Sequence, residues 1–261
     1  MSEHTHTHVH HHHGPTHSHS HGHSHGPAPE PQHGLTESQK KFIGSNAEHF
    51  DNMAEAYEKM PQAQELARRI STVMRETYPA LFDEDKTEML DYGCGPGLTS
   101  RELSPYVKTI VGVDISQAMI DLFNLRVANQ GIPPEEMRAV KIELKGEEGE
   151  LDGAKFDLII VVAAYHHFAD VKETTRMLTG FLKPGGSLLI ADILDDGTGK
   201  KPMDDFKHVV PHTAGFSEEG MKALLEGAGL REFGFTIAIP HVRIHEQDVK
   251  IFLATAKRPV Q

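Results

Sequence analysis

Glycine recurs at alternate positions in the segment Gly93-Cys94-Gly95-Pro96-Gly97, directly after an apolar run. Glycine lets the backbone approach a ligand without a side chain in the way, and a helix that follows such a turn presents free N–H groups. A dinucleotide-binding turn has the spacing G-x-G-x-x-G, but here the third glycine stands one position early, at Gly97. Pro96 also lacks an N–H that a pyrophosphate would use. The turn therefore favours an uncharged or cationic nucleoside, with a purely structural tight turn as the plain alternative.

Asp114 ends the next apolar run, 21 residues after Gly93. A carboxylate at the end of the second strand can accept hydrogen bonds from both hydroxyl groups of a ribose. The alternative role for Asp114 is to cap the start of the following helix. Together, the glycine turn and Asp114 predict a nucleoside pocket at the carboxyl ends of neighbouring strands, where open α/β sheets bind their ligands.

Short apolar runs alternate with amphipathic segments through most of the chain, and this pattern provides the elements that would position these residues. Strands alternating with helices predict a mainly parallel sheet that is covered on both faces. The expected strands are 88–92, 109–113, 139–144, 156–162 and 187–193, with a terminal antiparallel pair at 231–239 and 251–256. The expected helices are 36–59, 61–78, 116–130, 171–182 and 217–228.

The composition bounds the class of protein. The chain has 261 residues, 38% hydrophobic, which suffices for a sizeable core and excludes wholesale disorder. Its net charge of −12 argues against a protein whose main task is to grip a nucleic-acid backbone. With one cysteine, Cys94, no intrachain disulfide can form, so we expect a reducing, cytoplasmic compartment. No apolar run is long enough to span a bilayer, and the first residues do not read as a secretory signal.

Residues 1–34 form a segment of unusual composition. They hold 13 of the 20 histidines, without any Lys or Arg and with almost no apolar residues. Such a segment cannot bury enough surface to offset its ordering entropy, so we predict a disordered His-rich tail. Dense flexible imidazoles would bind transition metals loosely, although a plain solvated tail explains the composition as well. A catalytic metal site is not expected, because catalytic ligands need rigid support.

Five stretches of the chain, in order and spacing, resemble the class I S-adenosylmethionine-dependent methyltransferases. The resemblance covers about residues 45–257 and is to the small-molecule, ubiquinone/menaquinone-biosynthesis-like branch (methyltransferase type 11/12). The stretches are LDYGCGPG at 90–97, VGVDIS at 111–116, FDLIIVVAAYHHF at 156–168, LKPGGSLLIADI at 182–193 and GFSEEGMKALLEGAGL at 215–230.

This resemblance implies a Rossmann-like α/β fold with a seven-stranded, mainly parallel sheet. The implied strand order is 3-2-1-4-5-7-6, with strand 7 antiparallel and helices on both faces. It also implies one methyltransferase domain over residues 35–261, with an N-terminal helical cap at about 35–80 and an acceptor-side insertion at about 194–216. The sequence indicates no oligomeric state.

The resemblance further implies a set of residues that bind S-adenosylmethionine. Gly93 and Gly95 would bracket its methionine part, with Cys94 between them, and Asp91 would orient its amino end. Asp114 would take the ribose hydroxyls. The remaining assignments are Ile115 against the adenine, Glu143 as the acidic residue after strand 3 (where the usual Gly-Asp is missing), Ala163 beside the methionine part, and Tyr57 in the helical cap.

The implied reaction is methyl transfer to an oxygen, sulfur, nitrogen or carbon nucleophile of a small molecule, with release of S-adenosylhomocysteine. His166, which follows strand 4, and His212, in the 194–216 segment, are the candidate general bases. Ordinary structural roles are the alternative for both, and for their neighbour His167.

Rival interpretations are a nicotinamide-dependent reductase, an S-adenosylmethionine-binding regulatory protein with little turnover, a protein or nucleic-acid methyltransferase, and a metal buffer that works through the tail. The text Ala163-Ala164-Tyr165-His166 lacks the Asn/Asp-Pro-Pro-aromatic signature of enzymes that methylate base amines, so no nucleic-acid partner is expected.

Overall fold

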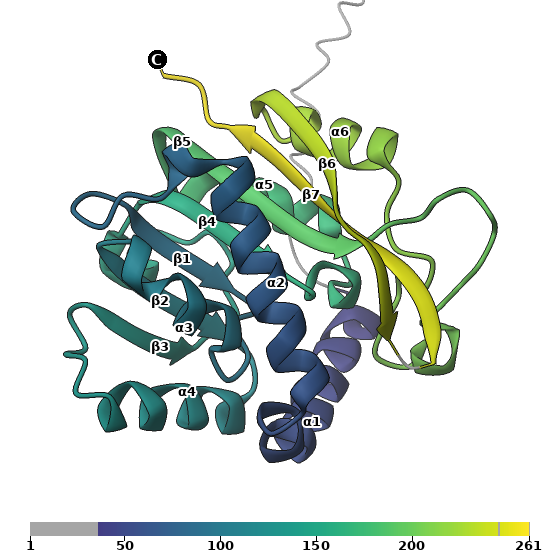
Figure 1. Ribbon diagram of the computed structural model, residues 1–261, viewed down its shortest axis with the longest axis horizontal. Helices are drawn as coiled ribbons and strands as arrows, with labels where there is room; N and C mark the ends of the chain where they lie inside the picture. Colours follow the sequence, from purple (N-terminus) through teal and green to yellow (C-terminus); the bar gives the residue numbers. More distant parts are fainter. Residues whose placement is uncertain (1–35, 245, 261) are drawn as a thin grey trace, which may run out of the picture. The chain divides into compact units, whose positions relative to one another are not determined.

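A seven-stranded sheet organises the protein, whose computed structural model describes residues 36–244 and 246–260 (Figure 1). The tail predicted at 1–34 lies outside the described residues. The strand order is β3-β2-β1-β4-β5-β7-β6, which confirms the predicted order. β1 to β5 pair in parallel, and β7 runs antiparallel to β5 and β6. The strands are β1 Glu88–Tyr92, β2 Thr109–Asp114, β3 Met137–Lys141, β4 Phe156–Val162, β5 Leu182–Ile193, β6 Arg231–Ile244 and β7 Gln247–Lys257.

Six α-helices lie within the described residues, and most begin where the sequence provides a cap. Thr36 forms a capping box with Gln39, and Ser116, Asp170 and Ser217 each accept a hydrogen bond from a backbone N–H in the first turn of their helix. The helices are α1 Glu37–Glu58, α2 Pro61–Thr77, α3 Leu98–Leu103, α4 Gln117–Asn129, α5 Val171–Phe181 and α6 Glu218–Gly227. Short 3-10 turns occur at Pro79–Leu81, Ser104–Tyr106, Glu150–Gly153, Tyr165–His167 and Asp204–Phe206.

The core has two parts, one on each face of the sheet. Successive side chains of a strand point to opposite faces, so in β4 Leu158 and Ile160 join one cluster while Ile159 and Val161 join the other. The first cluster takes in side chains of α2, α3 and α4, and the second takes in side chains of α5 and α6. Figure 1 shows α2 crossing the first face. Helices on both faces explain why β4 reads as an unbroken apolar run.

Four strands differ from the predicted bounds by two residues or more. β5 begins at Leu182, five residues before the predicted start at 187. β3 occupies Met137–Lys141, not 139–144, because its pairing with β2 stops at Lys141, opposite Asp114, where β2 itself ends. β6 and β7 extend well beyond the predicted 231–239 and 251–256 and pair as far as Ile244 and Gln247. Pro240 lies within β6, which is an edge strand, the place in a sheet where a missing N–H is tolerated.

The carboxyl ends of β1, β2, β4 and β5 meet at one edge of the sheet. This edge carries the glycine turn, Asp114, Ala163 and the end of β5. No helix within residues 36–244 and 246–260 has both the length and the apolar character that a membrane crossing requires.

Candidate functional site

The glycine turn is anchored to β2 by its backbone. The N–H groups of Gly93 and Cys94 both donate to the carbonyl of Val113, at 2.8 and 3.0 Å. The thiol of Cys94 is buried in the core, where a Cβ placed on Gly112 would come within 2.9 Å of its Sγ. Burial, reinforced by nearby carboxylates, raises the pKa of the Cys94 thiol well above its usual value. Cys94 therefore contributes to the turn through its backbone, and its thiol is not poised as a nucleophile.

The three glycines of the turn have positive φ angles of 75°, 51° and 81° but different surroundings. A Cβ on Gly93 would lie 2.8 Å from Cβ of Ala164, and one on Gly97 would lie 2.6 Å from the ring of Phe123. A Cβ on Gly95 would meet nothing nearer than 4.0 Å. Gly93 and Gly97 are thus required by packing, whereas a Cβ on Gly95 would make only ordinary contact with the sulfur of Met119, so the backbone there has room beside it.

The carboxylate of Asp114 lies beside this opening. Its Oδ2 accepts the N–H of Gly95 at 2.9 Å, and its Oδ1 accepts the N–H of Ser116 at 3.0 Å. Since a carboxylate oxygen accepts about two hydrogen bonds, each oxygen keeps room for a hydroxyl donor. Burial raises the pKa of Asp114 above its ordinary value, although the backbone N–H donors oppose this. Asp114 therefore orders the turn and keeps acceptor capacity for a ligand. The helix cap that was its alternative role belongs to Ser116 instead.

Asp91 is a buried carboxyl group behind the turn. It is 1% exposed, and its Oδ2 accepts the hydroxyl of Ser100 at 2.6 Å. Burial raises the pKa of Asp91 to about 7, and the negative charge of Asp114 adds to this effect. A cation bound nearby would favour the ionised form, so Asp91 suits the ammonium end of an amino acid.

The other residues predicted to contact the cofactor lie along the same edge of the sheet. Ile115 is partly exposed in the turn between β2 and α4. Glu143 follows β3, and its negative charge adds to the burial that raises the pKa of Tyr92, so it lies near the end of β1. Ala163 has a φ of +51°, a strained value for a residue with a Cβ, and its N–H donates to Ala191 at 2.8 Å.

Helix α1 is tied to the start of α4, close to Asp114. The carboxylate of Asp51 accepts the hydroxyl of Ser116 at 2.6 Å and the N–H of Ala118 at 3.0 Å. Burial alone would raise the pKa of Asp51, but these donors and a nearby lysine outweigh it and hold the pKa below its ordinary value. About two turns further on, Glu58 pairs with Arg126 of α4. No local pattern around Asp51 predicts this connection.

The inner face of α1 also reaches both halves of the site. Burial raises the pKa of the Tyr57 hydroxyl, and the charge of Asp114 adds to this, so Tyr57 lies beside the carboxylate. Phe50, seven residues earlier and so on the same side of the helix, packs edge-on against His167 with ring centroids 5.0 Å apart. The ring of His49 lies 5.9 Å from that of His208. α1 thus contacts the predicted ribose side and the predicted acceptor side at once.

His166 forms a buried pair with Asp192 at the carboxyl end of β5. Its Nδ1 lies 2.7 Å from Oδ1 of Asp192, and its backbone N–H donates to Oδ2 at 3.1 Å. The two residues are 5% and 1% exposed. Burial alone would raise the pKa of Asp192, but His166 and the N–H donors outweigh it, and the pKa lies below its ordinary value. The sequence interpretation missed Asp192, although a carboxylate inside the apolar run 187–193 was a usable signal, because a buried charge needs a partner.

His167 and His212 each have one ring nitrogen bound to a backbone carbonyl. Nδ1 of His167 lies 2.8 Å from the carbonyl of Val209, and Nε2 of His212 lies 3.1 Å from that of Phe168. Burial, together with the charge of His166, lowers the pKa of His167 to about 3, and burial also lowers that of His212. A carbonyl only accepts, so both rings donate from these nitrogens.

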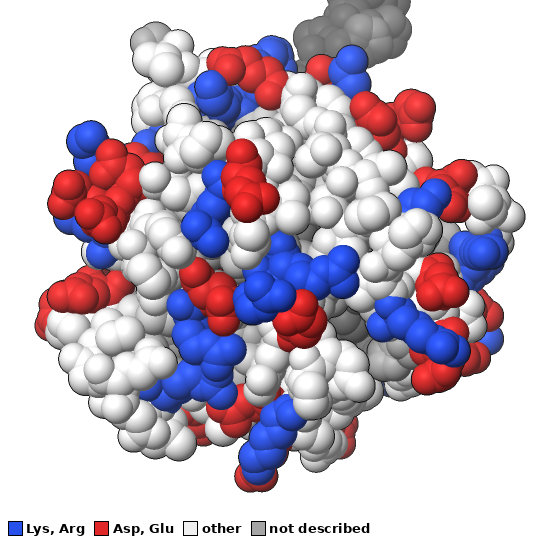
Figure 2. All heavy atoms as spheres, viewed as in Figure 1, with Lys and Arg blue, Asp and Glu red and all other residues white. Residues whose placement is uncertain are grey.

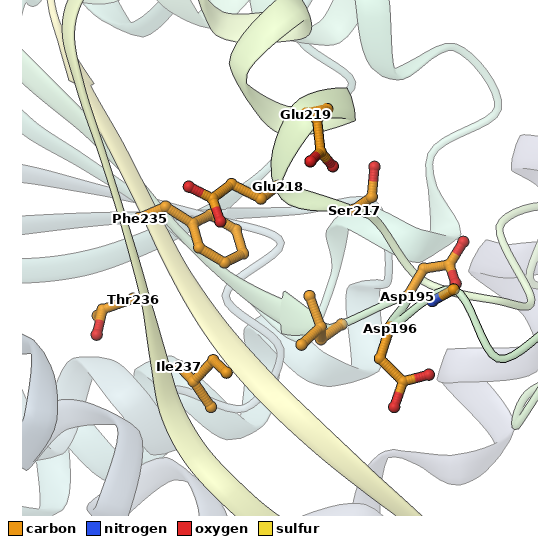
Figure 3. Close-up of a pocket in the computed structure, with 10 residues that line it drawn as sticks. Asp195, Asp196, Ser217, Glu218, Glu219, Phe235, Thr236 and Ile237 are labelled. Carbon is orange, nitrogen blue, oxygen red and sulfur yellow. The ribbon is translucent and has the colours of Figure 1, made fainter.

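A separate hollow of about 510 Å³ opens between the end of β5, the start of α6 and β6 (Figure 3). Several of its lining residues are acidic, but Asp195 accepts the N–H of Gly197 at 3.0 Å and Asp196 pairs with Lys250 at 3.2 Å. These two aspartates thus have partners in the protein, and we assign no ligand to the hollow. Among the residues that the structure describes, no group of three or more His, Cys, Asp or Glu side chains is arranged to hold a metal ion.

The sheet order, the open glycine turn and the carboxylate at the end of β2 define a class I S-adenosylmethionine-dependent methyltransferase fold. A family model described as a methyltransferase domain matches residues 63–232, which is more than half of the chain. The chain belongs to this methyltransferase family.

Similar proteins of known sequence or structure agree with this assignment. An uncharacterized methyltransferase of Schizosaccharomyces pombe is 36% identical over 149 residues, which are 54% of this chain and 52% of the relative. A ubiquinone biosynthesis O-methyltransferase of Bartonella tribocorum is 32% identical over 114 residues, 44% of each chain. The chain thus spans about half the length of the curated relatives it matches. The N-methyltransferase NodS from Bradyrhizobium japonicum, solved with S-adenosylhomocysteine, shares the fold, with a TM-score of 0.58 at 18% identity over 84% of this chain and 98% of NodS.

Proposed function

We propose that the protein transfers a methyl group from S-adenosylmethionine to a small-molecule acceptor and releases S-adenosylhomocysteine. When bound, this cofactor supplies a methyl group on a positively charged sulfur, which is already strongly electrophilic. The observation that carries the proposal is the open backbone at Gly95 beside the free acceptor positions of Asp114. A ribose with two hydroxyl donors and a side chain that passes over bare backbone suit this pair.

The residues at this edge of the sheet divide the binding of the cofactor among them. Asp114 would accept the ribose hydroxyls, and Asp91 would attract the amino end. Gly93 and Gly95 would leave room for the methionine part beside Ala163. In this proposal Ile115 and Glu143 serve the adenine, and Tyr57 covers the ribose from α1.

Several observations favour a small acceptor over a macromolecule. α1 contacts His167 through Phe50 and lies near Asp114 through Tyr57, so in this proposal the helix covers the reacting region. Figure 2 shows acidic and basic side chains interspersed over the face that α2 crosses, and the chain as a whole carries a net charge of −12. A polyanionic acceptor would be repelled by this balance. A reducing, cytoplasmic setting is part of the proposal, since the lone cysteine is a buried free thiol.

The chain's own contribution to the reaction would be to position the acceptor, exclude water and receive a proton. Holding two reactants in line supplies about 7–11 kcal/mol of a barrier. His166 and His212 are the groups proposed to receive the proton, and a general base contributes about 10²- to 10⁴-fold.

The proposal is tested by incubating the full-length protein with S-adenosylmethionine and measuring S-adenosylhomocysteine by mass spectrometry. The acceptor panel contains small phenols, alcohols, thiols and amines, with total RNA and a mixture of basic peptides as macromolecular acceptors. We expect product with small acceptors and a large loss of it in Asp114→Asn. Product with RNA or peptides alone, or none with any acceptor while the cofactor binds, would overturn the proposal.

A further inference from the structure

We infer that Asp192 is a positioning residue that keeps the proton of His166 on Nδ1, so that Nε2 receives the proton of a hydroxyl acceptor. This inference rests on the proposed function and deepens it, because it names a residue that acts through His166 and a chemical class of acceptor.

The carboxylate of Asp192 holds His166 at two points. Oδ1 bonds the ring at Nδ1, at 2.7 Å, and Oδ2 accepts the backbone N–H of the same residue, at 3.1 Å. The N–H of Ile193 donates to Oδ1 as well, at 2.7 Å, so the carboxylate itself is fixed. A carboxylate can only accept, so in the neutral ring the proton lies on Nδ1 and Nε2 keeps a free lone pair.

Burial of both side chains strengthens the hydrogen bond between Asp192 and His166. Asp192 is 1% exposed and His166 is 5% exposed, so little water competes for either group. Hydrogen bonds are stronger in such surroundings, and a buried carboxylate without its partner would be costly. Among the described histidines, His166 is the one whose ring bonds a carboxylate, whereas the rings of His167 and His212 donate to carbonyls. A carboxylate can stabilise the positive charge that a ring gains with a proton, and a neutral carbonyl does so less.

The pair also lies close to the glycine turn. His166 belongs to the 3-10 turn Tyr165–His167 after β4, and the preceding Ala164 is the residue that a Cβ on Gly93 would touch. The ring of His166 lies 4.3 Å, centroid to centroid, from that of His167, which packs against Phe50 of α1. The base is therefore placed between the cofactor turn and the helix that covers the acceptor side.

Proton removal matters most when the attacking atom is oxygen. A phenolic hydroxyl has an ordinary pKa of about 10, so it is largely protonated at neutral pH. In the proposed step the hydroxyl proton passes to Nε2 of His166, the oxygen forms a bond to the methyl carbon, and the electron pair of the broken carbon–sulfur bond stays on S-adenosylhomocysteine. His166 then returns the proton to water. Asp192 stays ionised throughout and balances the charge of the ring.

The position of the proton can be measured without knowing the acceptor. In ¹⁵N-labelled protein, two-dimensional NMR of the imidazoles distinguishes a proton on Nδ1 from one on Nε2, and His166→Gln identifies the signal. We expect His166 to carry its proton on Nδ1 in the wild-type protein and to lose this preference in Asp192→Asn. A proton on Nε2 in the wild-type protein, or an unchanged signal in Asp192→Asn, would overturn the inference.

Activity supplies the second readout. The assay uses the hydroxyl compound that the acceptor panel identifies. We expect kcat to fall about 10²- to 10⁴-fold in His166→Gln and at least about tenfold in Asp192→Asn. The kcat of both variants should rise again at high pH, where the acceptor ionises unaided. Binding of S-adenosylhomocysteine should stay within about twofold of wild type in both variants, which also shows that they fold. His241→Gln and Asp248→Asn, on the exposed parts of β6 and β7, are the matched controls.

The outcomes separate this inference from the proposed function. Absence of cofactor binding in the wild-type protein would defeat the proposed function, whatever the position of the His166 proton. Turnover with thiols or amines but not with hydroxyl compounds would leave the proposed function standing and defeat the inference.

Discussion

Replacing Gly95 with alanine would add one methyl group at the position where the glycine turn has room for it. The added Cβ would meet no protein atom nearer than 4.0 Å, so the folded chain has room for it. The backbone cost remains, because φ is +51° there and a left-handed conformation costs a residue with a Cβ about 1–2 kcal/mol. We expect Gly95→Ala to lower the melting temperature by about 2–8 °C.

Gly131 provides a matched control for this variant. It has a φ of +70°, a Cβ there would meet nothing within 4 Å, and it lies past the far end of α4. Gly131→Ala should therefore lose about the same stability, about 1–2 kcal/mol. Gly93→Ala should lose more, because its Cβ would lie 2.8 Å from Cβ of Ala164, and overpacking adds about 1–3 kcal/mol.

Binding of S-adenosylhomocysteine distinguishes the two open positions. If the cofactor passes over Gly95, the new methyl group occupies space that the ligand needs. A steric cost of about 1–3 kcal/mol corresponds to an increase in Kd of about 5- to 150-fold. Calorimetric titration should show this increase in Gly95→Ala and wild-type affinity in Gly131→Ala. Equal affinities in the two variants would refute the assignment of Gly95 to the cofactor.

Three further predictions follow from the contacts and charges of the site. Asp51→Ala removes the acceptor for Ser116 and Ala118, so we expect the free energy of unfolding to fall by about 0.5–2 kcal/mol. Amide hydrogen exchange in residues 37–58, measured by mass spectrometry, should be faster than in the exposed control Glu48→Ala. His167 has a pKa of about 3 in the folded state and about 6.5 in the unfolded state. Between these values the unfolded chain binds a proton that the folded chain does not bind, so the free energy of unfolding falls as the pH drops below about 6.5. Urea unfolding should show a loss of about 2 kcal/mol from this group between about pH 6.5 and pH 5, and His167→Gln should abolish that part of the slope. Asp91, with a pKa of about 7, is about half protonated at pH 7 in the free protein, and a bound ammonium group would lower its pKa. Binding of S-adenosylmethionine should then release up to about half a proton at pH 7, and the heat of binding should therefore differ between phosphate and Tris buffers. Asp91→Asn should remove this difference.

Much of the fold could be predicted because its signals are local. β4 is buried by helices on both faces and therefore reads as an unbroken apolar run, and Ser116 and Ser217 are side-chain caps that mark the starts of α4 and α6. The resemblance then supplied the strand order, which periodicity alone could not give. The bounds of β3 were missed because they depend on where its neighbour β2 ends, which is a property of the pair of strands.

The site, like the fold, was predicted only where its signals are local. Glycine at 95 and a carboxylate at 114 are recognisable by residue type and spacing, and the structure brings them within a hydrogen bond of each other. The contacts of Asp51 with Ser116 and of Asp192 with His166 join residues 65 and 26 positions apart. Such pairs depend on how helices and strands pack, so no local pattern indicated them, apart from the isolated carboxylate of Asp192 in a buried strand.

The most direct test that this edge of the sheet is the cofactor site is a calorimetric titration of S-adenosylhomocysteine into the full-length protein. The same titration is made with Asp114→Asn and with the exposed control Asp121→Asn. We expect one molecule bound per chain. The Kd should rise at least about tenfold in Asp114→Asn, because hydrogen bonds to a charged group are worth about 1.5–3 kcal/mol. The Kd should be unchanged in Asp121→Asn. A wild-type protein that shows neither heat nor a rise in melting temperature with this ligand, or an Asp114→Asn variant that binds it as tightly as the wild type, would contradict the assignment.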